Sequence, residues 1–173
     1  MTPLVRRERP EDATQVFSVI EAAFADRSVA EFAEEIRASP RYVPDLAFVA
    51  EEDDAIVGHT MLSLVGLEGH DDVLILTPMS VRPDRQGRGI GATLVRAALA
   101  AAEERDAPLV LCEGIPAYYP RFGFRSATAL GLLRPDERIP DAAWMAAPLS
   151  AYDPALRGRV VYPPFFPPPP ADA

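Results

Sequence analysis

Glycine stands at every second position of the segment from Gln86 to Ala92, directly before a stretch with the apolar spacing of an amphipathic helix. This feature constrains the fold more than any other. The three glycines let the backbone approach a ligand closely, and a helix start presents unpaired N–H groups and a positive dipole end. Arg85 and Arg88 add cationic donors. The segment predicts a pyrophosphate site, and the alternative is a glycine-rich turn with a purely structural role.

The pattern around this turn predicts a mixed α/β fold. Before the turn, strands are expected over 46–51, 56–67 and 73–81, joined by short polar turns into an antiparallel meander. After it, 90–105 predicts a helix and 109–112 a buried strand, parallel to its predecessor across that helix. Further elements are expected as a strand at 4–9, helices from Val16 to Phe24 and over 28–38, a helical turn at 117–121, and strands at 123–127 and 143–150.

The 173 residues suit one domain with its own hydrophobic core, which we place at 1–152. A proline-rich C-terminal tail follows over 153–173. Its extended polyproline character could serve as a ligand for a groove. The preferred alternative is a tail partly packed on the domain through Phe165 and Phe166.

The charge and the amino-acid composition of the chain exclude or disfavour several classes of function. The net charge of −9 argues against general nucleic-acid binding and suits a cationic substrate. All 17 basic residues are arginine, which excludes a Schiff-base lysine and a P-loop lysine from this chain. No apolar run has the length of a membrane span, and residues 1–10 lack the pattern of a signal peptide, so the cytoplasm is the expected location.

The residues that could make a nucleophile or a metal site are few. Cys112 is the single cysteine and ends an apolar run, where a thiol usually behaves as a small core residue. His59 is expected on a strand surface and His70 in a turn. No metal site is predicted.

The glycine segment also has a second interpretation. Gly87, Gly89 and Ala92 fit the G-x-G-x-x-G/A dinucleotide fingerprint, and Glu113 lies at about the right distance to hold a ribose. That fingerprint follows a strand directly, whereas residues 82–86 intervene here. A nicotinamide enzyme is therefore the less favoured interpretation.

Two motifs together resemble a known family. Residues 79–83 followed by Gln86-x-x-Gly89-x-Gly91 resemble the signature of the GNAT superfamily of acetyl-coenzyme A-dependent N-acetyltransferases. The match continues at 117–124, where a tyrosine precedes Gly-Phe by four residues. More narrowly, 116–124, 130–132 and 161–165 resemble the YhbS-type acetyltransferases of bacteria.

The resemblance implies a mixed antiparallel and parallel central sheet, flanked by helices and splayed at the cofactor site between the strands that end at Val81 and Glu113. The splay would admit the pantetheine arm of acetyl-coenzyme A, and the N–H of Met79 would polarise the thioester carbonyl. The residues implied in cofactor binding are Met79, Ser80, Val81, Gln86, Gly87, Arg88, Gly89, Ile90 and Gly91.

The reaction needs a base for the amine and an acid for the departing thiolate. Tyr119 matches the tyrosine of the superfamily and is the expected acid, with Tyr118 as the alternative. Glu113 is the candidate base; otherwise it pairs with a neighbouring arginine. Ile115 stands where YhbS-type proteins often carry an aspartate. An isoleucine cannot act as a base or bind an amine, so any substrate role of that aspartate is missing in this chain.

The expected function is direct acetyl transfer to a primary amine of a small molecule or peptide, without metal, membrane or nucleic-acid partner. The acceptor would be recognised by loops near 25–35 and 133–142. A homodimer is compatible with the resemblance. The alternative from another class is a non-catalytic acyl-coenzyme A-binding module that regulates other proteins.

Overall fold

The computed structural model describes residues 3–169, and the end of the predicted tail, 170–173, lies outside them. The chain divides into two compact units. Unit 1 contains the described residues up to Ser63 together with Thr77–Ala101, and unit 2 contains Leu64–Leu76 together with the described residues from Ala102. Each unit is built around its own group of buried apolar side chains.

Unit 1 is built on the N-terminal strands. β1 (Leu4–Arg7) pairs antiparallel with β2 (Tyr42–Glu52), and β2 pairs antiparallel with β3 (Ala55–Leu67). β4 (His70–Val81) is the next neighbour of β3. β3 and β4 run from one unit into the other, because the unit boundaries fall within both strands.

Three helices cover the strands of unit 1. α1 (Ala13–Phe24) ends at Ala25, which adopts a left-handed conformation with a φ of 51°. α2 (Arg27–Arg37) begins after Asp26, whose carboxylate accepts a hydrogen bond from the N–H of Ser28 at 2.8 Å. α3 (Ile90–Glu104) follows the glycine segment, after the 3₁₀ turn Pro83–Arg85.

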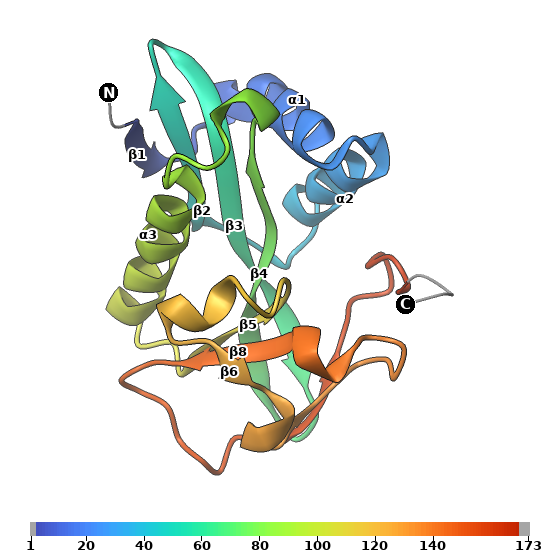
Figure 1. The fold of residues 1–173 in the computed structure, drawn as a ribbon. Coiled ribbons are helices and arrows are strands. Elements are labelled where there is room, and N and C mark those ends of the chain that lie inside the picture. Colours follow the sequence, from blue (N-terminus) through green and yellow to red (C-terminus); the bar gives the residue numbers. More distant parts are fainter. Residues whose placement is uncertain (1–2, 170–173) are drawn as a thin grey trace. The chain divides into compact units, whose positions relative to one another are not determined.

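Two neighbouring residues of β3 show that the helices lie on opposite faces of these strands. A Cβ placed on Gly58 would lie 3.0 Å from Leu94 Cδ1 of α3. The next side chain, His59, points the other way and lies 3.5 Å from the Arg37 guanidinium of α2. Because successive residues of a strand face opposite sides, α3 covers one face and α2 the other (Figure 1).

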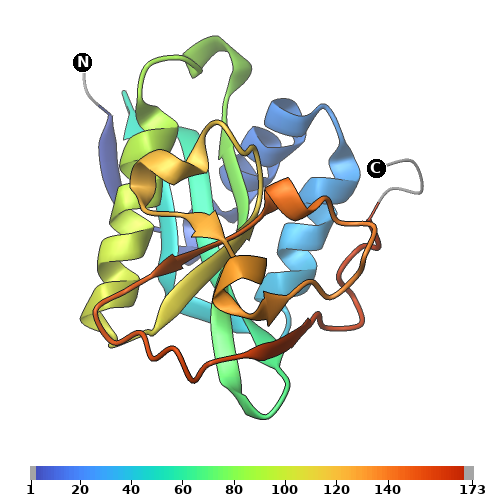
Figure 2. The same ribbon diagram turned by 60° about the horizontal axis from the view of Figure 1, so that its bottom comes forward.

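Unit 2 continues from the far parts of β3 and β4. β5 (Leu109–Glu113) pairs parallel with β4, from Leu74 opposite Val110 to Leu76 opposite Cys112. β8 (Trp144–Pro148) pairs antiparallel with β5 and with the short β6 (Arg125–Ser126). β9 (Gly158–Val161) pairs with β3 and with β7 (Leu132–Leu133), and Figure 2 shows it in dark red beside the end of the β3–β4 hairpin.

The core of unit 2 gathers around Trp144, which is fully buried and donates its indole N–H to the Leu132 carbonyl at 2.9 Å. The C-terminal segment contributes to this core. Val160 is 1% exposed, and Tyr162 and Phe166 pack against the buried cluster. The chain after β8 is therefore structurally part of unit 2.

The α/β fold class expected from the sequence is confirmed, and so is the parallel pairing of β4 with β5. Two strands of the C-terminal half, β7 and β9, were not expected. No described helix has the length and apolar character needed to cross a membrane.

The sequence-based expectation for His59 is wrong. His59 is not a strand-surface residue: it is fully buried, and its Nε2 lies 2.9 Å from a carboxylate oxygen of Glu8. The other oxygen of Glu8 accepts from Arg37 at 2.7 Å. We call Glu8, Arg37 and His59 the buried ionic cluster. The strand pattern alone suggested exposure because both charged partners lie far away in the sequence.

Candidate functional site

The glycine segment forms an open turn in unit 1. Gly87 and Gly89 have φ values of 72° and 82°, in the left-handed region that favours glycine. A Cβ built on either residue would meet no heavy atom within 4 Å. The protein itself leaves this space free, so a ligand can approach the backbone there.

α3 begins directly after these glycines. The N–H of Thr93 donates to the Gly89 carbonyl at 3.1 Å, which is the first bond of this spacing in the helix. The amide groups before Thr93 therefore have no acceptor within the helix. Together with the helix dipole, they suit the negative charge of a phosphate or pyrophosphate group.

Gln86 fastens the turn to the end of β4. Its side-chain amide donates to the Val81 carbonyl at 3.0 Å. On the other side, the N–H of Arg82 donates to the Val57 carbonyl at 2.9 Å. The turn thus has a fixed starting point, although the 3₁₀ turn Pro83–Arg85 separates it from the strand. This separation is the one that disfavoured the dinucleotide fingerprint.

The two arginines of the turn differ in their surroundings. Arg85 donates to Glu52 at 2.5 Å and to Asp84 at 2.7 Å, and these carboxylates raise its pKa. Arg85 is therefore engaged by two carboxylates in this structure, and its role as a cationic donor for a ligand stays a prediction. Arg88 is exposed at the turn itself.

The end of β4 carries the other residues expected at the cofactor. Met79 is half-buried, while Ser80 is 2% exposed and its hydroxyl donates to the His59 carbonyl at 3.5 Å. Val81 is buried. These side chains stabilise the strand, so their backbone groups are what a ligand could use.

The candidate catalytic residues lie in unit 2, at the end of β5. Glu113 is the last residue of the strand and stands opposite Trp144 of β8. Its carboxylate accepts a hydrogen bond from the Tyr162 hydroxyl at 3.3 Å, so its partner is a tyrosine and not the arginine considered from the sequence. Although Glu113 reaches solvent, the protein around it desolvates the carboxyl group and raises its pKa, an effect that the Tyr162 hydrogen bond opposes.

Tyr119 lies against the backbone just beyond Glu113. The chain turns back after Gly114, as the N–H groups of Tyr118 and Tyr119 donate to the Ile115 carbonyl at 3.0 and 3.4 Å. A Cβ on Gly114 would lie 2.3 Å from Cε2 of Tyr119. Gly114 is therefore the residue that admits the Tyr119 ring.

Other aromatic rings fix the orientation of Tyr119. Phe124 and Tyr118 contact it edge-to-face, with ring centroids 5.4 and 5.2 Å away. Tyr119 is 7% exposed, and burial raises the pKa of its phenol above the ordinary value of 10.0. Burial also raises the pKa of the Cys112 thiol, which is 1% exposed. Tyr119 thus keeps its proton, and Cys112 is a core residue.

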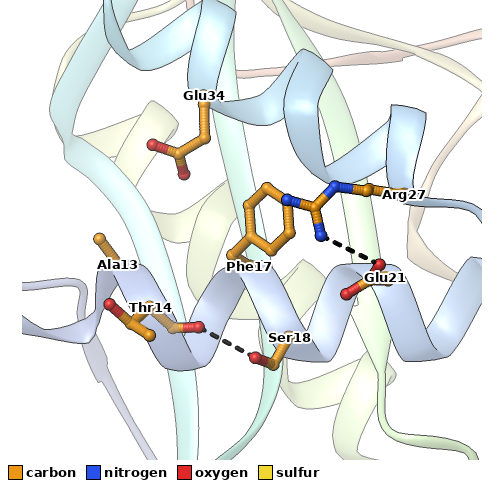
Figure 3. A pocket seen from close by; sticks show the side chains of 7 residues that line it. All are labelled: Ala13, Thr14, Phe17, Ser18, Glu21, Arg27 and Glu34. Atoms are coloured by element: carbon orange, nitrogen blue, oxygen red, sulfur yellow. Dashed lines mark hydrogen bonds and ion pairs between the residues drawn. The ribbon is translucent and has the colours of Figure 1, made fainter.

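A recess of about 400 Å³ lies between α1 and α2 in unit 1 (Figure 3). Its lining combines Phe17 with the carboxylates of Glu21 and Glu34. The Arg27 guanidinium lies over the Phe17 ring, 4.8 Å from its centroid, and 3.5 Å from Glu21. Glu34 forms an ion pair with Arg37, so both carboxylates of the recess are paired with arginines of the chain, and Arg27 itself lines the recess.

Among residues 3–169, no three side chains of His, Cys, Asp or Glu are grouped so that they could hold a metal ion. His70 is exposed, but it is the first residue of β4 and not the turn residue that was expected.

The chain resembles proteins of known fold over nearly its whole length. The model of the acetyltransferase (GNAT) domain matches residues 44–126. The crystal structure of a GNAT family acetyltransferase from Brucella melitensis in complex with acetyl-CoA is 30% identical, with a TM-score of 0.78, and the match covers 95% of this chain and 97% of that one. The chain belongs to the GNAT acetyltransferase family.

Two Escherichia coli proteins place it more narrowly within the GNAT family. The structure of the N-acetyltransferase YhbS in complex with CoA has a TM-score of 0.86 at 25% identity, over 95% of this chain and 92% of that one. The uncharacterized N-acetyltransferase YjhQ of strain K12 is 27% identical over 155 residues, or 86% of each protein. The YhbS-like GNAT assignment and the acyltransferase class expected from the motifs are confirmed.

The structure places the expected site residues in two groups. Met79–Val81 and Gln86–Gly91 belong to unit 1, whereas Glu113 and Tyr119 belong to unit 2. Sequence reasoning did not single out Tyr162, which contacts Glu113. The only signal for it was the resemblance of 161–165 to YhbS-type proteins, since 49 residues separate the two partners.

Proposed function

We propose that this GNAT protein transfers the acetyl group of acetyl-coenzyme A to a primary amine by direct attack. The observation that carries the proposal is the open glycine turn at the start of α3, whose left-handed glycines leave their outer side free. The CoA in the YhbS complex and the acetyl-CoA in the Brucella complex support this donor.

In this proposal the N–H groups of Gln86–Gly91 hold the pyrophosphate of the donor, and Arg88 adds charge. The backbone of Met79, Ser80 and Val81 pairs with the amide groups of the pantetheine arm, as an added strand would. The Met79 N–H polarises the thioester carbonyl. A donor of this kind stabilises a transition state by about 3 kcal/mol.

The reaction forms a C–N bond and breaks the C–S bond of the thioester. Glu113 removes the proton from the attacking amine, and Tyr119 donates its proton to the departing thiolate. The raised pKa of Glu113 makes it a better base than an ordinary carboxylate, while the raised pKa of Tyr119 keeps the phenol protonated before transfer. The buried Cys112 thiol offers no thiolate for a covalent intermediate.

The acceptor we propose is a cationic amine of a small molecule or peptide. The net charge of −9 favours positively charged molecules. A free primary amine of this class still needs a base to lose its proton, which is the role given to Glu113.

The experiment is a screen of amines, amino acids and peptides with acetyl-coenzyme A, in which the released thiol is measured. We expect at least one amine to consume acetyl-coenzyme A above the rate of hydrolysis, with the acetylated product seen by mass spectrometry. Tight binding of coenzyme A without turnover of any amine would instead support a non-catalytic acyl-coenzyme A-binding module. An acetyl group retained on the protein would contradict direct transfer.

A further inference from the structure

We infer that Tyr162, from the C-terminal segment, is a positioning residue that holds and tunes the carboxylate of Glu113. The inference rests on the proposed function, in which Glu113 is the base. It adds a residue to the site that lies outside both motifs of the family signature.

The contact itself is a hydrogen bond from the Tyr162 hydroxyl to Oε2 of Glu113 at 3.3 Å. A carboxylate at the end of a strand can otherwise rotate among several rotamers. A fixed phenol donor selects the rotamer in which one oxygen is occupied and the other remains free to accept a proton.

The backbone on either side of this pair is fixed by strand pairing. Tyr162 follows β9 directly, where Val161 pairs with Gly66 and Gly158 pairs with Leu132. Glu113 ends β5, where it stands opposite Trp144. Both partners therefore sit at the ends of paired strands within unit 2, which limits how far either can move.

Two other aromatic rings contact the ring of Tyr162. Trp144 contacts it edge-to-face at 6.4 Å, and Phe166 contacts it at 4.7 Å between ring centroids. The N–H of Phe166 donates to the Pro163 carbonyl at 2.9 Å, and this turn brings Phe166 back onto the tyrosine. The proline- and phenylalanine-rich sequence after β9 thus orients one phenol.

The hydrogen bond affects how Glu113 titrates. Burial raises the pKa of Glu113, and the bond from Tyr162 lowers it, because the bond favours the charged form. Two further titratable groups among the described residues lie beside this part of β5: Cys112, the preceding residue, and Tyr119, whose ring lies against Gly114. Loss of the Tyr162 hydroxyl should therefore raise the pKa of Glu113 and leave less of the base ionised near neutral pH.

The test compares Tyr162→Phe with Tyr152→Phe. Tyr152 packs against the same buried cluster, whereas the hydroxyl that bonds Glu113 belongs to Tyr162, so Tyr152 is a matched control. In the acetyl-transfer assay, Tyr162→Phe should move the acidic limb of the kcat/KM profile to higher pH and lower kcat/KM on that limb by about three- to tenfold. Tyr152→Phe should leave the limb in place. A Tyr162→Phe profile that is lowered equally at every pH would mean that Tyr162 only packs, and would overturn the inference.

A second measurement does not depend on acetyl transfer. The carboxyl carbon of Glu113 is followed by NMR titration in glutamate-labelled protein, with its signal assigned by its absence in Glu113→Gln. An upward shift of the Glu113 titration in Tyr162→Phe, and none in Tyr152→Phe, supports the coupling; an unchanged titration rejects it. If no amine is acetylated, the proposed function fails, while this titration still decides whether Tyr162 controls Glu113.

Discussion

The ring of Tyr119 occupies the space where a side chain on Gly114 would begin. A Cβ on Gly114 would stand 2.3 Å from Cε2 and 2.8 Å from Cδ2 of Tyr119, distances that no real contact allows. The glycine that follows Glu113 therefore determines where the proposed acid lies. The requirement comes from steric fit, since Gly114 does not have the left-handed backbone of Gly87 or Gly89.

Gly114→Ala should displace the Tyr119 ring and reduce acetyl transfer at least tenfold, because an acid shifted by about 1 Å no longer meets the leaving group. Overpacking at this point should also cost about 1–3 kcal/mol of stability. The control is Gly66→Ala in the same unit, where the new Cβ would lie 3.4 Å from its nearest neighbour. Equal activity of the two variants, measured by thiol release, would show that the Tyr119 position does not matter.

Gly89→Glu should abolish coenzyme A binding while the protein stays folded. The new Cβ meets no protein atom within 4 Å, and a side chain on this left-handed backbone lowers the stability of the fold by only about 1–2 kcal/mol. The substitution should therefore impair ligand binding and not folding. Gly69→Glu is a matched control, because Gly69 has a φ of 78° and equally open surroundings in the β3–β4 turn. Calorimetry should show that coenzyme A binds the Gly69 variant and not the Gly89 variant. Binding of coenzyme A to both variants would show that the pyrophosphate does not lie at Gly89.

Tyr119→Phe should lower kcat by about 100-fold and leave the affinity for coenzyme A nearly unchanged, since the phenol acts on the leaving thiolate and not on the bound ground state. Tyr118→Phe, on the neighbouring ring, should retain most activity. Steady-state kinetics with the amine found in the screen provides the measurement. If the Tyr118 variant shows the greater loss, the acid role belongs to that residue.

The buried ionic cluster predicts that stability falls in acid. Burial opposes ionisation of Glu8, but its bonds from His59 and Arg37 lower its pKa below the ordinary 4.5, and burial lowers the pKa of His59 below 6.5. Both folded-state values lie below the unfolded ones, so the unfolded chain takes up protons first. The stability that these groups contribute is complete above about pH 6.5 and is lost as the pH falls through the folded-state values.

Glu8→Gln tests this cluster. The variant should lose about 3 kcal/mol in the free energy of unfolding near neutral pH, because Arg37 is left buried without its full charge partner. The difference in the free energy of unfolding between the variant and the unaltered protein should shrink as the pH approaches about 4, because Glu8 of the unaltered protein then becomes protonated, first in the unfolded chain. Glu31→Gln, which removes a surface partner of Arg27, should change stability by less than about 1 kcal/mol. The free energies are measured by urea unfolding over this pH range. If the free energy of unfolding of the Glu8 variant depended on pH in the same way as that of the unaltered protein, the prediction would be contradicted.

The features predicted well from the sequence depend on short segments. The glycine turn and α3 are set by residues within a few positions of each other, and α2 ends at Arg37, one residue before the end expected from the sequence. Because the crossover from β4 to β5 contains one helix, the parallel pairing also followed from local spacing.

The features that were missed depend on partners distant in sequence. His59 was expected on the surface because its partner Glu8 lies 51 residues away. β9 is a four-residue strand in a proline-rich region, and its pairing with β3 and β7 cannot be read from local propensity. The same reason hid Tyr162, whose contact with Glu113 does not depend on its neighbours in the chain.

In the proposed mechanism, the amide groups at the start of α3 hold the pyrophosphate of coenzyme A. This contact can be measured by isothermal titration calorimetry of the unaltered protein with coenzyme A, and separately with pantetheine. We predict clear binding of coenzyme A and at least about tenfold weaker binding of pantetheine, which lacks the pyrophosphate. No binding of coenzyme A at millimolar concentration, or equal affinity for the two ligands, would contradict the claim.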